Sequence, residues 1–352
     1  MRYSVFGESH GPCIGIVLEG LPAGLVLDMD FIGKEMSRRS PGHSATATAR
    51  READIPEIVS GYFEGRTTGS PLCAIIRNTD AHSHDYAAIR YLARPGHADY
   101  AAFMRYGGFS DHRGGGHFSG RLTAPLVFAG AVAKQILSGR GITVYAHIRS
   151  IAEIGDSEVN AARPDLEALA AVSKKTFPTL DDACGIAMRQ AILAAKSEED
   201  SVGGIIECII AGLPGGTGGP DINETAEGIF ARHLFAVPAV KGVEFGAGFG
   251  FASLRGSEAN DEPYPAADGT VSMRTNHSGG ITGGISTGMP IVFSVVIRPT
   301  PSIGKMQHTI DVRTGEAAEI SIEGRHDPCI VPRAVPVIEA SAALAAMELL
   351  GL

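Results

Sequence analysis

Residues 123–137 read TAPLVFAGAVAKQIL, which is the most strongly patterned segment of the 352-residue chain. Its apolar residues recur at helical spacing, and alanine is abundant. Pro125 stands near the start of the segment, where a missing backbone N–H does no harm to a helix. The segment therefore predicts a mostly buried helix.

Short apolar segments on either side of this helix are bounded by glycine or proline or are rich in β-branched residues, and they predict strands. They are residues 14–19, 73–77, 205–211 and 291–297. Further helices are predicted at residues 165–175, 187–196 and 337–350, the last of which is Ala-rich and strongly apolar. Because helices and strands are mixed along the chain, the expected fold class is α+β.

Two segments of the chain echo each other. Residues 17–24 read VLEGLPAG and residues 209–216 read IIAGLPGG, which suggests two related α+β halves. A chain of this length is long for one compact core. No Ser-rich or Pro-rich linker separates the halves, however, so we expect a single domain over residues 1–352.

The composition, with 44% hydrophobic and 20% charged residues, is that of an ordinary soluble protein. A net charge of −9 opposes attraction to nucleic acid and to anionic membranes. No apolar run reaches the roughly 18 residues of a membrane span, and the first residues lack the apolar core of a signal peptide, so we expect a cytoplasmic protein. The scattered cysteines are predicted to be reduced thiols: Cys13, Cys73, Cys184, Cys208 and Cys329.

Residues with catalytic potential stand in glycine-containing turns. Residues 7–11 (GESHG) carry His10, whose imidazole can transfer a proton near neutral pH. Residues 94–100 (RPGHADY) carry a second imidazole, His97, on a turn. Residues 324–329 (GRHDPC) contain Asp327, which is a candidate base. A turn without a ligand is the alternative interpretation of the first two segments.

Arginines and glycines indicate an anion site. Four arginines lie within residues 38–51, and planar guanidinium groups suit phosphate and carboxylate oxygens. Residues 111–121 (DHRGGGHFSGR) lead into the helix predicted from Thr123. Three successive glycines there predict a nest of free backbone N–H groups, to which the helix N-terminus adds positive potential. The segment is neither a Walker loop nor a Rossmann fingerprint.

A metal site is the rival interpretation of the 12 histidines, above all for His82 and His84 beside Asp80 and Asp85. Most histidines stand among glycines or arginines, and nearby cations oppose a divalent metal. We therefore expect no metal. A metal-dependent hydrolase would lose its activity to a chelator, which distinguishes the two interpretations.

Taken in order, these segments resemble the signature regions of chorismate synthase. The likeness is carried by residues 7–11, 114–134 and 324–340, and further by residues 38–52, 78–80, 94–100, 239–244 and 276–286. It extends over nearly the whole chain. The fold that it implies is a β-α-β sandwich, with helices packed between antiparallel sheets, assembled as a homotetramer.

The resemblance implies a lyase of aromatic amino acid biosynthesis in the shikimate pathway. The family converts 5-enolpyruvylshikimate 3-phosphate to chorismate and phosphate by a trans 1,4-elimination, with reduced FMN that is not consumed overall. Because this substrate carries a phosphate and two carboxylates, several arginines must converge on it. NADPH enters only as a reductant of the flavin, and the lack of a nicotinamide fingerprint favours an external flavin reductase.

Carried over by position, the catalytic residues are His10, which assists the departing phosphate, His97, which lies beside the flavin, and Asp327, which acts with flavin N5 on the C6 proton. Substrate contacts are expected at Ser9, Arg39, Arg121 and Arg325. Flavin contacts are expected at His117, Phe118, Ser119, Pro238, Ala239, Gly283, Arg298, Pro299, Thr300, Pro301, Ser302 and Arg325.

Three positions depart from residues common in the family: Ala45 replaces an arginine, Pro238 an asparagine and Arg298 a lysine. Loss of the arginine at position 45 would weaken an anion or nucleotide contact, for which Arg50 or Arg51 is a substitute. The alternative function is a non-catalytic protein that binds a flavin or a phosphosugar. Such a protein would need the arginines and glycines but not the three catalytic residues.

Overall fold

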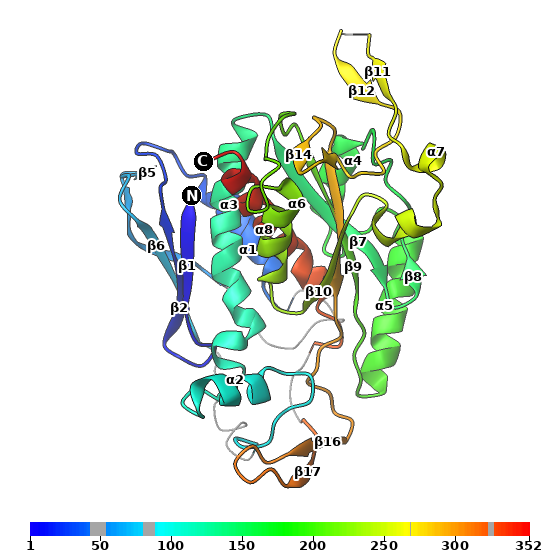
Figure 1. Ribbon diagram of the computed structural model, residues 1–352. Coiled ribbons are helices and arrows are strands. Elements are labelled where there is room, and N and C mark those ends of the chain that lie inside the picture. Colours follow the sequence, from blue (N-terminus) through cyan, green and yellow to red (C-terminus); the bar gives the residue numbers. More distant parts are fainter. Residues whose placement is uncertain (43–53, 80–88, 268, 323–326) are drawn as a thin grey trace.

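Two antiparallel sheets enclose a layer of helices in the computed structural model (Figure 1). The structure describes residues 1–42, 54–79, 89–267, 269–322 and 327–352. The first sheet has the strand order β1-β2-β6-β3 and the second the order β10-β15-β9-β7-β8. This arrangement confirms the predicted α+β class and the β-α-β sandwich.

Neighbouring strands in both sheets run antiparallel. The first sheet contains β1 (Arg2–Gly7), β2 (Cys13–Glu19), β3 (Glu57–Ser60) and β6 (Leu72–Arg77). The second contains β7 (Thr143–Ile151), β8 (Ile154–Gly155), β9 (Gly204–Ala211), β10 (Val240–Phe245) and β15 (Ile291–Ile297). Short hairpins lie outside the sheets: β4 (Tyr62–Phe63) with β5 (Arg66–Thr67), β11 (Pro263–Pro265) with β12 (Val271–Met273), β13 (Ile281–Thr282) with β14 (Ile285–Ser286), and β16 (Gln307–Ile310) with β17 (Ala317–Ile320).

The helices α1 (Met29–Arg39), α3 (Thr123–Ser138), α6 (Ala226–Phe235) and α8 (Val331–Leu349) lie between the sheets (Figure 1). The outer face of the second sheet is covered by α4 (Leu166–Val172), whose Leu169 packs against Ile209 and Val292. In the described part of the chain, the remaining helices are α2 (Asp99–Tyr106), α5 (Asp182–Ser197), α7 (Gly256–Ala259) and the 3-10 turns at Gly116–Phe118, Gly120–Leu122 and Gly248–Ser253.

α3 and α8 cross in close contact at the centre of the helix layer. A Cβ atom at Gly130 would lie 2.3 Å from Cα of Ala340, so this approach requires glycine. Both helices are apolar around most of their circumference because sheets and helices surround them. One hydrophobic cluster joins both sheets and the helix layer. The assignment of residues 1–352 to a single domain stays a prediction.

The two halves of the chain repeat one topology. Along the chain, β1, β2, β3 and β6 correspond to β7, β9, β10 and β15, and the two sets have the same order within their sheets. α1 follows β2 as α6 follows β9, and α3 follows β6 as α8 follows β15. The sequence echo lies in equivalent turns, where Gly20 and Gly212 have φ angles of 85° and 83°. The predicted internal repeat is therefore confirmed.

Most predicted elements are confirmed, but two helices begin earlier than predicted. α5 begins at Asp182 rather than at residue 187, because the side chain of Asp181 accepts from the N–H groups of Ala183 and Cys184 and so caps the first turn. α8 begins at Val331 rather than at residue 337. Its buried packing outweighs the single hydrogen bond that Pro336 cannot make.

Gly130→Ala is expected to destabilise the protein by about 1–3 kcal/mol, because the new methyl group overlaps Ala340 and forces α3 and α8 apart. Gly33→Ala in α1 is the matched control, since a Cβ there meets no atom within 4 Å and alanine is favoured in a helix by about 1 kcal/mol. Urea denaturation measures the free energy of unfolding of both variants. Equal stability of the two variants would contradict the close crossing.

A buried histidine lies between two carboxylates on the second sheet. Nε2 of His147 on β7 lies 3.1 Å from Glu207 Oε2, and its Nδ1 lies 3.7 Å from Asp156 Oδ2. The side chain is 1% exposed. Burial opposes the imidazolium charge, but hydrogen bonds and attraction to Asp156 and Glu207 outweigh it and raise the pKa of His147 to about 9.

Because the folded pKa of His147 exceeds that of a free histidine, its stabilising contribution is complete below about pH 6.5 and is lost as the pH rises toward 9. A fall in unfolding free energy on the order of 3 kcal/mol is expected over that range. Denaturation of wild type and His147→Gln at pH 6 and pH 9 measures the difference. The same pH dependence in the variant would exclude this histidine as its source.

Candidate active site

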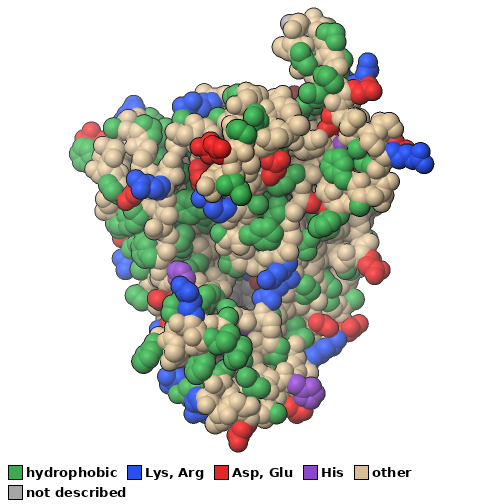
Figure 2. Space-filling view, viewed as in Figure 1, with side chains coloured by type: hydrophobic (Ala, Val, Ile, Leu, Met, Phe, Trp, Pro, Cys, Tyr) green, Lys and Arg blue, Asp and Glu red, His purple; other side chains and the backbone are tan. Residues whose placement is uncertain are grey.

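A cavity of about 290 Å³ lies at the N-terminal ends of α3 and α8. Thr123 of α3, Arg333 of α8 and Arg39 at the C-terminal end of α1 line it. Figure 2 shows the surface hollowed between α2 and the helix layer, with lysine or arginine side chains on either side. Most of the remaining wall comes from the loops that precede α3 and α8. Equivalent connections of the two halves therefore meet at one place.

His10, His97 and Asp327 all line this cavity, although they are far apart in the sequence. They come from the β1–β2 turn, the loop before α2 and the loop before α8, respectively. Their proximity is a property of the tertiary structure. It brings two imidazoles and one carboxylate to a single space.

His10 is held in place by the segment before α3. Ser9 Oγ lies 3.2 Å from Nδ1 of His10, and Ser9 Oγ accepts from the N–H of Gly115 at 3.3 Å. A Cβ at Gly114 would lie 2.3 Å from Cε1 of the imidazole, so the ring packs directly on this glycine. His10 is consequently buried, with 7% of its surface exposed.

The predicted nest of free amides in the triple-glycine segment is wrong for two of its three N–H groups. Gly115 donates to Ser9 Oγ, and Gly116 donates to the carbonyl oxygen of Arg113 at 3.1 Å. Gly114 is needed because it lies against His10 and Ser9, where a side chain does not fit. A Cβ at Gly115 would instead crowd Ser119, and one at Gly116 would lie 2.3 Å from the carbonyl oxygen of Asp111. The positive end of α3 does reach the cavity, since Thr123 lines it.

His97 is oriented by Asp99 at the start of α2. Nδ1 of His97 lies 2.7 Å from Oδ1 of Asp99, which also receives Nη2 of Arg94 at 2.7 Å. Burial opposes the charge of Asp99, but hydrogen bonds from Arg94 and His97 hold its pKa well below the usual range. A carboxylate that stays ionised favours a proton on Nδ1 of His97.

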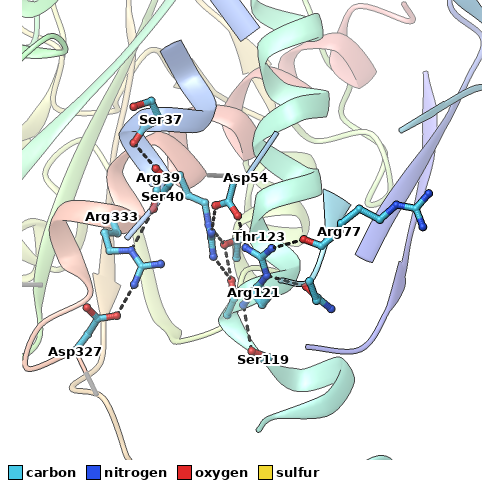
Figure 3. A network of polar contacts seen from close by, with 12 residues as sticks. Ser37, Arg39, Ser40, Asp54, Arg77, Ser119, Arg121, Thr123, Asp327 and Arg333 are labelled. Carbon is cyan, nitrogen blue, oxygen red and sulfur yellow. Dashed lines mark hydrogen bonds and ion pairs between the residues drawn. The ribbon is translucent and has the colours of Figure 1, made fainter. Parts of the chain in front are cut away.

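Asp327 forms an ion pair with Arg333 on the first turn of α8. Nε of Arg333 also donates to the backbone oxygen of Arg39 at 3.1 Å. The arginine therefore links the loop before α8 to the end of α1, and it fixes the carboxylate at the cavity wall (Figure 3).

Arg39 and Arg121 share one buried carboxylate, that of Asp54 (Figure 3). Nη1 of Arg39 lies 2.5 Å from Oδ2 of Asp54, and Nη1 of Arg121 bonds to Oδ1. Burial opposes the charges of both Asp54 and Arg39. Attraction to Arg39 and Arg121 nevertheless lowers the pKa of Asp54, while burial and the neighbouring arginines lower the pKa of Arg39 to about 10.

Asn78 connects this cluster to the turn that carries His10. Its Oδ1 accepts from Nε of Arg121 at 3.0 Å, and its Nδ2 donates to the carbonyl oxygens of Glu8 and Gly11 at 3.0 and 2.8 Å. The position of the His10 turn is therefore tied to that of Arg121.

The structure brings most of the residues expected at the flavin to the same cavity. Those that line it are Phe118, Ser119, Pro238, Ala239, Arg298, Thr300, Pro301 and Ser302. Three others do not line it. Nδ1 of His117 bonds to the oxygen of Gly7, Pro299 lies between two lining residues, and Gly283 forms the turn of the β13–β14 hairpin.

Two cavity residues have buried polar atoms without a hydrogen-bond partner in the described part of the chain. They are Nε of Arg298 and Oγ1 of Thr300. Such atoms are costly unless a ligand or water satisfies them. The residues present therefore fit a bound polar group at this wall of the cavity.

Several predicted residues lie outside the described residues, among them the substrate contact Arg325 and the departure at Ala45. The same holds for Arg50, Arg51 and the proposed metal ligands at positions 80–85. Within the residues that the structure describes, no group of three or more histidine, cysteine or carboxylate side chains could hold a metal ion.

Sequence reasoning missed the residues that hold the functional side chains. Asp99 had a local signal, because it follows His97 by two positions in a tight turn. Arg333 was visible as a cation in the Pro-rich segment before the apolar helix predicted from residue 337. Asn78 belongs to a segment that carries the family likeness, but no role was expected of it. Asp54 had no signal, since its partners Arg39 and Arg121 lie 15 and 67 residues away.

This layered α+β fold, with an arginine-rich cavity that holds two histidines and an aspartate, defines an enzyme for a small, multiply charged anion. The family model for chorismate synthase matches residues 1–350. The chain belongs to the chorismate synthase family.

Individual relatives agree over nearly the full length of the chain. The chorismate synthase of Aeropyrum pernix is 46% identical over 350 residues, which cover 99% of this chain and 90% of the relative. That of Methanocella arvoryzae is 47% identical over 348 residues, covering 99% and 91%. A solved structure described as a crystal structure of chorismate synthase has a TM-score of 0.78 and 28% identity, covering 99% of this chain and 91% of its own.

Gly114→Ala is expected to lower kcat by about 100-fold, because the methyl group displaces the imidazole of His10. Gly65→Ala is the matched control, since Gly65 also has a positive φ but a Cβ there meets no atom within 4 Å. Steady-state turnover of both variants at equal folded concentration measures the effect. A similar loss in both would point to backbone strain instead of contact with His10.

Proposed function

We propose that this protein converts 5-enolpyruvylshikimate 3-phosphate to chorismate and phosphate by a trans 1,4-elimination. It then acts as a lyase of the shikimate pathway in aromatic amino acid biosynthesis, in keeping with its family. Nothing in the described structure favours a non-catalytic binding protein. Such a protein would not need His10, His97 and Asp327 around one cavity.

The observation that carries this proposal is the convergence of His10, His97 and Asp327 with arginines on one cavity. Among the described residues, the arginines that line it are Arg39, Arg94, Arg121, Arg298 and Arg333. A phosphate and two carboxylates on one small ring require such a set of guanidinium groups. The acidic protein thus presents a local positive surface to an anionic substrate.

His10 acts as the general acid toward the departing phosphate. Because Ser9 Oγ bonds to Nδ1 of His10, we assign the transferred proton to Nε2. Ser9 therefore orients the ring in addition to lining the cavity. Arg39 and Arg121 stabilise the negative charge that develops on the leaving group.

Asp327 accepts the C6 proton of the substrate, on the opposite side of the elimination. Its ion pair with Arg333 fixes the carboxylate against the cavity wall. Asp99 fixes the ring of His97 at the cavity wall, where the imidazole can contact the bound groups.

Reduced FMN, when bound, supplies electron density transiently to the allylic system as phosphate leaves. The residues that would hold it here are Phe118, Ser119, Pro238, Ala239 and the residues of the 298–302 loop that line the cavity. The buried Nε of Arg298 and Oγ1 of Thr300 support this assignment, because the polar atoms of a bound cofactor would satisfy them.

The remaining features rest on the family resemblance. We propose a cytoplasmic homotetramer that receives reduced flavin from an external flavin reductase, with NADPH as a reductant only. We propose neither a membrane nor a nucleic acid as a partner. Within the described residues, every helix is too short or too polar to cross a bilayer.

An anaerobic assay with reduced FMN tests the function, following chorismate absorbance and phosphate release together. His10→Ala is expected to lower kcat by about 10²–10⁴-fold, the usual contribution of a general acid. His308→Ala is the control, because this histidine is exposed on β16 and does not line the cavity. Full activity without flavin would refute the cofactor assignment, and unchanged turnover of His10→Ala would remove His10 from the mechanism.

A further inference from the structure

Asp54 lies behind the two arginines that the substrate is expected to meet. Its side chain is fully buried and bonds to both Arg39 and Arg121. Both arginines line the cavity, whereas Asp54 is not among the residues that do so. Its carboxylate therefore acts on an anion in the cavity only through the two guanidinium groups.

The arginines keep other partners that do not depend on Asp54. Nε and Nη2 of Arg39 donate to Thr123 Oγ1 and to the oxygen of Gly120, both at 3.1 Å. Nε of Arg121 donates to Asn78 Oδ1 at 3.0 Å. These acceptors are neutral. They hold the orientation of both side chains, while only Asp54 among these partners changes their net charge.

Two other carboxylates at the cavity are also paired with arginines that line it. Asp99 pairs with Arg94, and Asp327 pairs with Arg333. The three carboxylates thus cancel part of the positive charge that the arginines bring to the cavity. Such cancellation matters because an unbalanced charge a few ångströms from an anion changes its binding by an order of magnitude or more.

We propose that Asp54 limits how tightly the cavity holds anions, because it fixes Arg39 and Arg121 together and cancels one of their two positive charges. Asp54 is then a positioning residue that sets specificity and product release. Without it, phosphate is retained and other anions compete. This inference rests on the proposed function, since it assumes that the arginines bind substrate and release phosphate.

Asp54→Asn is the direct test, because asparagine has the same shape and accepts the left-handed backbone of this position, where φ is 47°. The probe is inorganic phosphate, titrated into the full-length protein without flavin at fixed ionic strength. The Kd for phosphate is expected to fall at least about tenfold in the variant. With reduced FMN and substrate, KM and kcat are both expected to fall, since release of phosphate becomes slower.

Glu35→Gln is the matched control. Glu35 is a buried carboxylate of the helix layer that contacts Arg38 and Lys134 and does not line the cavity. The Kd of the Glu35→Gln variant for phosphate is expected to stay within about twofold of that of wild type. Equal tightening in both variants would reveal a general effect of net charge and overturn the inference. A higher KM for Asp54→Asn, or an unchanged Kd, would also overturn it.

Thr123→Asp tests the inference with the opposite sign, in case Asp54→Asn does not fold. The new carboxylate would face Nε of Arg39 at the start of α3, where an acidic residue is tolerated. Phosphate binding is expected to weaken about tenfold, and binding as tight as in wild type would contradict the charge argument.

The phosphate titrations need neither flavin nor substrate, which separates the two proposals. If wild type forms no chorismate but Asp54→Asn still tightens phosphate binding, the proposed function fails and the charge argument stands. If wild type forms chorismate and phosphate binding does not change in the variant, only the role of Asp54 fails.

Discussion

The crossing of α3 and α8 at Gly130 and Ala340 is the constraint on which the site depends. The two helices occupy equivalent places in the repeated halves, and their N-terminal ends reach the same cavity. The distance between them fixes how far the loop before α3 lies from the loop before α8. Arg121 and Asp327, which belong to these loops, therefore line one cavity because two helix backbones can approach closely.

Local cancellation of charge allows an acidic protein to build a positive cavity. The net charge is −9, yet arginines line the cavity. Arg39 and Arg121 share the buried carboxylate of Asp54, and Arg94 and Arg333 each pair with a partly buried aspartate. A buried charge without a partner is costly, so each carboxylate both stabilises the fold and sets the potential that a ligand meets. Stability and anion binding are consequently properties of the same contacts. Figure 3 shows this for Arg39, Asp54 and Arg121.

Glycine has a different role from the one that the local pattern predicted. The three glycines before α3 looked like a nest of free amides, but two of their three N–H groups are used, one by Ser9 and one by the loop itself. Their lack of side chains matters more, because His10 packs against Gly114. A pattern in the sequence can therefore identify a segment as part of the site and still give the wrong physical reason.

The family resemblance singled out His10, His97 and Asp327, which line one cavity in the structure. The sequence by itself also determined the buried helix from Thr123, most strands and the repeat. These features depend on local periodicity and residue type, which a linear pattern records. Only the tertiary structure decided that Asp54 joins Arg39 to Arg121 and that Asn78 links them to the His10 turn. Such partners lie 15 to 67 residues apart in the sequence. Hydrogen bonds between them leave no periodic trace, because they depend on how the layers pack.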